Sequence, residues 1–371
     1  MNVGLRAELI AVILTVSAVG FARPMPAQDT IVLRSLEVAG GKVAELTDAG
    51  IAFEDGRRIP WQQALKSNLG SPLKSEFEKQ VAEKGWPLFR TDQLLRNKDL
   101  LGLQNTAEML HGRLQTEPAA FTDEERFLIL VAAFKSRVAT GRRPDAVLPF
   151  LRAARIRRQK KVTEDKCVAF GFSDASMSVG VTTEILPVWF DQEAARNAAK
   201  QVEPLVKSDL TGSTGELYYL ASLHLKAGDL LAAKLLIKQL ENRTSPLPKG
   251  WREILQTQFD IADGRSVSAI SRLQKQLDSF PIALRMTANY LIGVELGKDP
   301  QSLDLAVLTL LKIPAAEQQK LSALNAAALY QASQLLQKDG QEGEVLTVEN
   351  ELLNRFSNTY HARLIKLGRA K

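Results

Sequence analysis

The side chains that commonly perform catalysis or bind metals are few in this chain and lie far apart. The 371 residues contain one cysteine, Cys167, and three histidines, His111, His224 and His361. A single cysteine excludes an intramolecular disulfide and a cysteine-based zinc site. His224 falls on the apolar face of an amphipathic segment, which favours a core histidine over a ligand or a general base. We therefore predict no catalytic residue, no metal site and no cofactor.

Two residues between 160 and 187 support a hydrolase as the alternative hypothesis. Gly171–Ala175, with the sequence GFSDA, is similar to the Gly-x-Ser-x-Gly turn that exposes the nucleophile of α/β-hydrolases, here Ser173. Cys167 has three lysines nearby, and neighbouring cations activate a thiol. However, no helical pattern follows Ala175, and the alternating strands and helices of a parallel sheet are missing from the sequence. We expect a polar loop here.

Positive charge is concentrated between residues 135 and 161, where ten lysines and arginines accompany one acidic residue, Asp145. This local excess is larger than the net charge of the whole chain, +6. Such a segment attracts an anionic surface or polymer, although a solvated helix flank is the simpler interpretation. Few aromatic residues and an expected export signal disfavour nucleic acid. The candidate contacts with an anionic surface are Arg152, Arg155, Arg157, Arg158, Lys160 and Lys161.

The start of the chain has the pattern of an export signal. Leu9–Phe21 is apolar, follows Arg6 and precedes small and proline-rich residues. The run is too short to span a bilayer, which needs about 20 residues. We expect residues 1–27 to be a signal peptide cleaved after Ala22 or Ala27, which leaves no transmembrane span. The predicted location is the periplasm or cell envelope, and an uncleaved N-terminal membrane anchor is the alternative.

Residues 28–66 carry short β-type runs. Ile31–Leu33, Lys42–Leu46 and Gly50–Phe53 are separated by glycine-containing turns. The pattern predicts a small meander of three or four strands, which needs helices or a partner to be stable. It resembles the SH3-like or Sm-like β-units of many exported bacterial proteins.

Helical periodicity dominates from residue 72 onward. Residues 72–158 predict N-terminal helical hairpins. Residues 159–190 are rich in small, hydroxyl and β-branched residues and predict an irregular insertion, which in a compact array is often functional. Residues 191–371 return to helical hairpins and end in a cap helix.

Gly215–Asn242 gives the unit of this array. Apolar residues spaced by three and four form one helix face before Gly228 and another after it. Gly228 stands where the chain must reverse and tolerates a positive φ. Turn glycines recur at 264, 297 and 340, separated by 36, 33 and 43 residues. Each hairpin can bury its apolar face only against its neighbours, so the units should stack in series as a curved rod.

This repeat of two helices in about 34 residues resembles the tetratricopeptide repeat family. The matching positions of the first unit are Leu217, Leu220, Ala221, His224, Gly228, Leu230, Ala233, Ile237 and Leu240. The next unit keeps Gly264, Ala269, Leu273 and Pro281. The expected fold class is mainly α, an α-solenoid of antiparallel helical hairpins with a small N-terminal β meander. The resemblance implies a concave groove that holds an extended peptide or a helix of a protein partner.

These observations predict a non-catalytic protein-interaction scaffold of the cell envelope. Its partner segment would bind in the groove of residues 215–356, and its basic segment would orient it on an anionic surface. The alternatives are a hydrolase with its site in residues 160–187 and a purely structural envelope protein.

Overall fold

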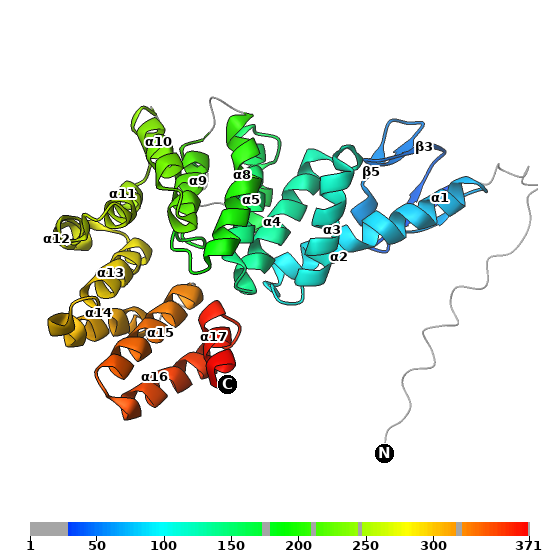
Figure 1. The fold of residues 1–371 in the computed structure, drawn as a ribbon. Coiled ribbons are helices and arrows are strands. Elements are labelled where there is room, and N and C mark those ends of the chain that lie inside the picture. The colour runs from blue at the N-terminus through cyan, green and yellow to red at the C-terminus, as the bar shows by residue number, and fades with distance from the viewer. Residues whose placement is uncertain (1–28, 173–178, 209–212, 244–246, 317–320, 370–371) are drawn as a thin grey trace, which may run out of the picture. The chain divides into compact units, whose positions relative to one another are not determined.

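A computed structural model describes residues 29–172, 179–208, 213–243, 247–316 and 321–369. The chain divides into an N-terminal unit, Met1–Gly85, and a helical unit, Trp86–Lys371. The predicted fold class, mainly α with a small N-terminal β region, is confirmed by these elements (Figure 1). The predicted signal peptide, residues 1–27, lies outside the described residues.

The described part of the N-terminal unit contains two three-stranded antiparallel sheets. The strand order is β2-β1-β6 in one sheet and β3-β4-β5 in the other. The prediction of a single meander is wrong, because β6 returns from beyond the last predicted strand to pair with β1 and places Ser67 opposite Ile31. The strands are β1 (Thr30–Leu33), β2 (Val38–Gly40), β3 (Val43–Thr47), β4 (Gly50–Phe53), β5 (Arg58–Ile59) and β6 (Ala64–Asn68).

A helix completes the core of this small unit, as a β-region of this size requires. Helix α1 (Leu73–Gln80) buries Phe77 against Trp61, with ring centroids 5.8 Å apart. The indole Nε1 of Trp61 donates a hydrogen bond of 2.8 Å to the carbonyl oxygen of Thr47. Strands and helix therefore share one apolar core.

The helical unit consists of successive helices joined mostly by short turns. Its described helices of eight residues or more are α2 (Trp86–Arg96), α3 (Gln104–Thr116), α4 (Asp123–Ala139), α5 (Arg143–Arg158), α8 (Gln192–Lys207), α9 (Thr214–Ala227), α10 (Leu230–Glu241), α11 (Trp251–Ala262), α12 (Ser266–Gln276), α13 (Ile282–Leu296), α14 (Leu303–Ala315), α15 (Ser322–Lys338), α16 (Glu342–Arg355) and α17 (Tyr360–Arg369).

Neighbouring helices in the sequence pack on each other, as in α9–α10, α11–α12, α13–α14 and α15–α16. Figure 1 shows these hairpins along a curved path within the unit, so that α17 returns toward the turn between α4 and α5. At that turn, a Cβ added to Gly141 would lie 3.2 Å from the carbonyl oxygen of Asn358. The array therefore curves back on itself, whereas the sequence predicted a curved rod.

Two of the turn glycines are required for different reasons. Gly228 ends α9 with a φ of 86°, in the left-handed region that glycine adopts without strain. Gly297 ends α13 with a φ of −68°, which any residue can adopt. A Cβ there would lie 2.7 Å from Cδ2 of Leu335, so this glycine lets α13 and α15 approach each other.

The predicted irregular insertion contains a short helix and a stretch without regular secondary structure. Helix α6 (Glu164–Ala169) buries Cys167. Residues 180–191, which we call the inner segment, follow without regular secondary structure and are largely buried. They contact α5, α9 and α11, the helices that form the inner side of the curve.

Candidate functional site

Side chains of the surrounding helices bind the backbone of the inner segment. The hydroxyl of Tyr219 donates to the carbonyl oxygen of Ile185 at 2.7 Å and accepts from the backbone N–H of Thr182 at 3.2 Å. Nη2 of Arg143 donates to the carbonyl oxygen of Leu186 at 3.0 Å. These bonds supply partners that a buried backbone without regular secondary structure would otherwise lack.

The next residues of the inner segment are bound by α11 and α9, through a backbone carbonyl group and an indole side chain. Nε2 of Gln258 donates to the carbonyl oxygen of Pro187 at 2.6 Å. The indole Nε1 of Trp189 donates to the hydroxyl of Ser222 at 3.0 Å. The inner face of this array thus already binds one irregular stretch of its own chain.

The inner segment passes so close to the start of α9 that only glycine fits there. A Cβ on Gly215 would lie 2.0 Å from the carbonyl oxygen of Gly180. We expect Gly215→Ala to lower the free energy of unfolding by about 1–3 kcal/mol, as overpacking does. It should also speed proteolysis within the inner segment. Gly112→Ala in α3 is the control, because a Cβ there meets nothing within 4 Å. Chemical denaturation curves that coincide for wild type and Gly215→Ala would contradict the expectation.

A cavity of about 380 Å³ lies between the inner segment and the inner helices, and we call it the larger cavity. Its lining is mostly apolar and aromatic with a few polar groups, as in most ligand sites. The residues of α9, α11 and α13 that line it are Ser222, Leu225, Lys226, Gln258, Ile261, Ala262, Tyr290, Leu291, Val294 and Glu295. Val188, Trp189, Phe190, Gln331 and His361 complete it.

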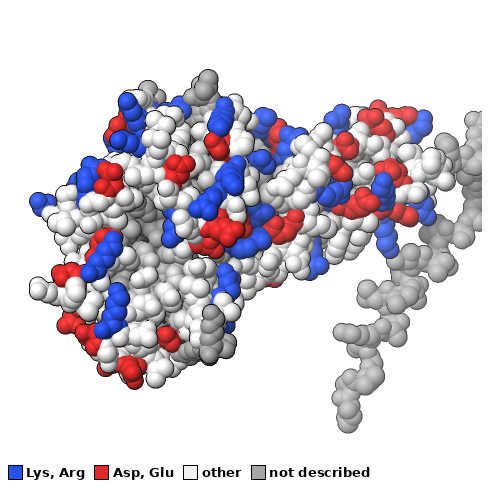
Figure 2. All heavy atoms as spheres, in the orientation of Figure 1, with Lys and Arg blue, Asp and Glu red and all other residues white. Residues whose placement is uncertain are grey.

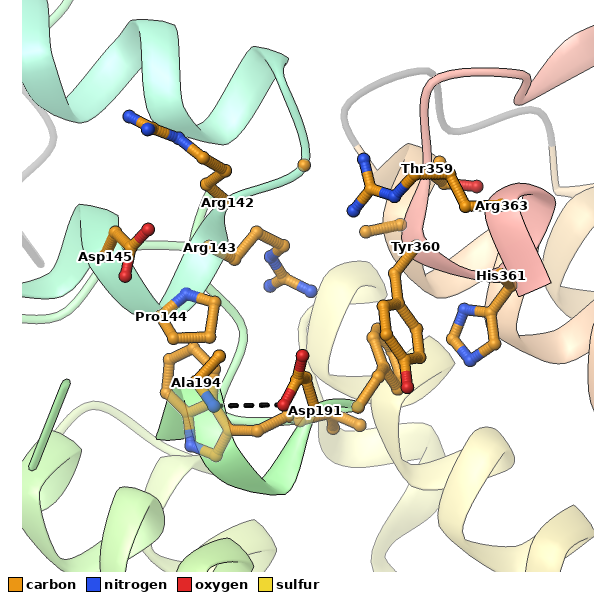
Figure 3. A pocket seen from close by; sticks show the side chains of 15 residues that line it. Arg142, Arg143, Pro144, Asp145, Asp191, Ala194, Thr359, Tyr360, His361 and Arg363 are labelled. Carbon is orange, nitrogen blue, oxygen red and sulfur yellow. Dashed lines mark hydrogen bonds between the residues drawn. The ribbon is translucent and has the colours of Figure 1, made fainter. Parts of the chain in front are cut away.

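A second cavity, of about 140 Å³, lies where α17 meets the turn between α4 and α5. Three arginines line it, Arg142, Arg143 and Arg363, and we call it the arginine cavity. Figure 3 shows the guanidinium groups of Arg143 and Arg363 facing the space between the starts of α5 and α17. Arg142 points away and forms an ion pair with Glu108.

Phe190 and His361 line both cavities. Their ring centroids are 4.6 Å apart, with the planes at 73°. His361 is only 4% exposed, and its Nδ1 has no hydrogen-bond partner among the described residues. Burial, with a smaller contribution from the charge of Lys226, lowers the pKa of His361 to about 4. This imidazole is therefore neutral at neutral pH.

Arg143 is the buried cation of the arginine cavity. The side chain is 6% exposed, and burial lowers the pKa of its guanidinium to about 10, so that it stays charged at neutral pH. Its hydrogen bond to Leu186 is with a neutral carbonyl group. No acidic residue within the described ranges forms an ion pair with it.

Acidic residues outside the basic run of residues 135–161 compensate about half of its charge. Among the described residues, seven of its ten cations form ion pairs, and they share five carboxylates. The pairs are Lys135–Glu184, Arg137–Glu108, Arg142–Glu108, Arg155–Glu216, Arg157–Glu164, Arg158–Glu216 and Lys161–Asp123. Figure 2 accordingly shows charges of both signs interspersed on the face in view.

The six predicted contacts with an anionic surface fall into three groups. Arg155 and Arg158 are half-buried and hold the fully buried carboxylate of Glu216. Arg152 is half-buried beside them, and Arg157 donates to the carbonyl oxygen of Phe172 at 2.7 Å. Only the last group, Lys160 and Lys161, is exposed.

The residues of the hydrolase hypothesis are not assembled into a site by the described structure. Cys167 is fully buried, and burial raises the pKa of its thiol, whereas a nucleophilic cysteine needs a lowered pKa. His224 is half-buried at the end of α9, with Nδ1 3.5 Å from Oδ2 of Asp229. Ser173 lies outside the described residues.

No protein-family model, curated protein or solved structure matches the chain. Over the described ranges, no three histidine, cysteine, aspartate or glutamate side chains gather closely enough to hold a metal ion. In the same part of the chain, no helix combines the length and the apolar character needed to cross a membrane.

Proposed function

We propose that the protein is a non-catalytic interaction scaffold of the cell envelope that binds a segment of a partner protein on the inner face of its hairpins, residues 215–356. The observation that carries this proposal is the larger cavity, since helices from successive hairpins, α9, α11, α13 and α15, contribute to one lining. A shared inner surface of this kind is how stacked hairpins bind extended chains.

The inner segment supports a particular mode of binding. Tyr219 and Gln258 bind carbonyl oxygens of this segment, which is a mode that does not depend on the side chains of the bound chain. A partner in the larger cavity would add apolar contacts with Leu291 and Val294 and polar contacts with Gln331, all of which are half-buried and line the cavity. We infer that the partner supplies an apolar side chain flanked by extended backbone.

A charged side chain in the larger cavity tests this proposal. Leu291→Arg on α13 should abolish capture of the partner from envelope fractions, because a long charged side chain would replace part of the apolar wall that the partner's side chain contacts. Leu308→Arg on the next helix, α14, is the matched control, since Leu308 is 60% exposed and does not line the cavity. Equal capture by wild type and Leu291→Arg, with both variants shown to be folded by circular dichroism, would refute the proposal.

For orientation on an anionic surface, the geometry supports fewer contact residues than the six that the sequence suggested. Lys160 and Lys161 are exposed, whereas Arg155 and Arg158 neutralise Glu216 inside the protein. We propose that Lys160 and Lys161 make this contact. Exposed lysines of this kind act through long-range attraction, which salt screens.

A further inference from the structure

We propose that the arginine cavity is a binding site for a small carboxylate, held between Arg143 and Arg363. The proposal goes beyond the partner groove and does not depend on it, because Leu291 and the rest of the α13 lining belong to the larger cavity alone.

The first argument is the uncompensated charge of Arg143. A buried guanidinium is costly unless an anion or several hydrogen bonds compensate it. Here one N–H group donates to Leu186, and Figure 3 shows the guanidinium facing the cavity. Asp145 and Asp191 line the same cavity, but neither forms an ion pair with Arg143 among the described residues. A bound anion would supply the missing partner.

The second argument is the direction of the surrounding helices. The starts of α5, α8, α15 and α17 all contribute to the lining, through Asp145, Ala194, Ala323 and Thr359. Helix N-termini carry partial positive charge and free N–H groups, which favour an anion. Asp191 caps α8 by accepting from the N–H of Ala194 at 3.0 Å, whereas α5 and α15 begin without a side-chain cap.

The third argument selects a monoanion with an apolar body. Two aspartates in the lining repel a second negative charge on the ligand, which disfavours a phosphate dianion. Trp189, Phe190 and Tyr360 supply aromatic surface on the remaining walls. The volume of about 140 Å³ restricts the ligand to a small molecule. A planar carboxylate also matches the fork geometry of arginine.

Benzoate and benzamide test the proposal, since they have the same shape and differ in charge. In calorimetric titrations of the full chain at pH 7.5 and low salt, benzoate should bind and benzamide should not. Arg363→Gln should weaken benzoate binding by about tenfold or more, the effect of losing one charge-assisted hydrogen bond. Arg363 is exposed and forms no ion pair among the described residues, so this variant should fold. Arg143→Gln should abolish binding.

The controls separate this site from the partner groove. Arg252→Gln, on the exposed side of α11, and Leu291→Arg should both bind benzoate as wild type does. A short peptide with a free C-terminal carboxylate, compared with its amide, shows whether the natural carboxylate is a peptide terminus or a free small acid. Equal binding of benzamide, tighter binding of inorganic phosphate, unchanged affinity in both arginine variants, or no binding of benzoate at millimolar concentration would overturn the proposal.

Discussion

Replacing both Arg155 and Arg158 by glutamine should lower the free energy of unfolding by about 3–5 kcal/mol, the usual effect of leaving a buried charge without its partners. Glu216 is 0% exposed, and its two carboxylate oxygens lie 3.0 Å from Nη2 of Arg155 and 2.8 Å from Nη2 of Arg158. The double variant would bury this carboxylate unpaired. Chemical denaturation followed by circular dichroism measures the change.

Replacing the acidic partner instead, by Glu216→Gln, should lower the free energy of unfolding by less than the double arginine variant does. The difference between the two variants is the sharper test. Glu216→Gln leaves two half-buried arginines that can turn toward water. Arg152→Gln is a further control, because Arg152 has no acidic partner among the described residues. Burial, and then repulsion from Arg155, lower the pKa of Arg152. Its removal should change stability by less than about 1 kcal/mol. A double variant as stable as Arg152→Gln would show that the pairs around Glu216 contribute nothing.

Acidification should destabilise the protein through His361. Its pKa is about 4 in the folded protein and 6.5 in the unfolded chain, so the unfolded chain binds the proton first as the pH falls. The neutral imidazole therefore contributes full stability above pH 6.5, and this contribution is lost between pH 6.5 and 4. A difference of 2.5 pKa units at about 1.36 kcal/mol each amounts to about 3 kcal/mol.

His361→Phe isolates this contribution from other acid-sensitive groups. His361 packs among Phe190, Tyr330 and Tyr360, with ring centroids 4.6–5.2 Å apart, so a phenyl ring suits the position. His111 also has a pKa lowered to about 4 by burial, but it is present in both proteins and cancels. The free energy of unfolding should fall more steeply with acid in wild type. If the free energy of unfolding changed equally with pH in wild type and His361→Phe between pH 7 and 4, His361 would not be the source of this acid sensitivity.

Local patterns were sufficient to predict the helical hairpins. The apolar spacing around Gly228 predicted α9 and α10. Such signals depend on residues three or four positions apart, which a sequence displays directly.

The cavities could not be predicted in this way, because their residues meet only after the array has closed. Arg143 and Arg363 are separated by 220 positions, and Phe190 contacts His361 across 171. The ion pairs of the basic run could not be predicted from the sequence for the same reason. Its cations appeared unpaired because their partners, Glu108, Glu184 and Glu216, come from helices and loops elsewhere in the chain.

The contact between the α4–α5 turn and the residues before α17 makes the helical unit different from an open row of repeats. In an open row, each repeat interacts with its neighbours only, so the ends fray and repeats can be added or removed. Here Gly141 lies beside Asn358, so the end of the array is held against the α4–α5 turn, which α2 and α3 precede. Adding or removing a hairpin between these two points would therefore disrupt the contact. Forming this contact also requires a loop of more than 200 residues to close, which favours late assembly and all-or-none unfolding of the ring.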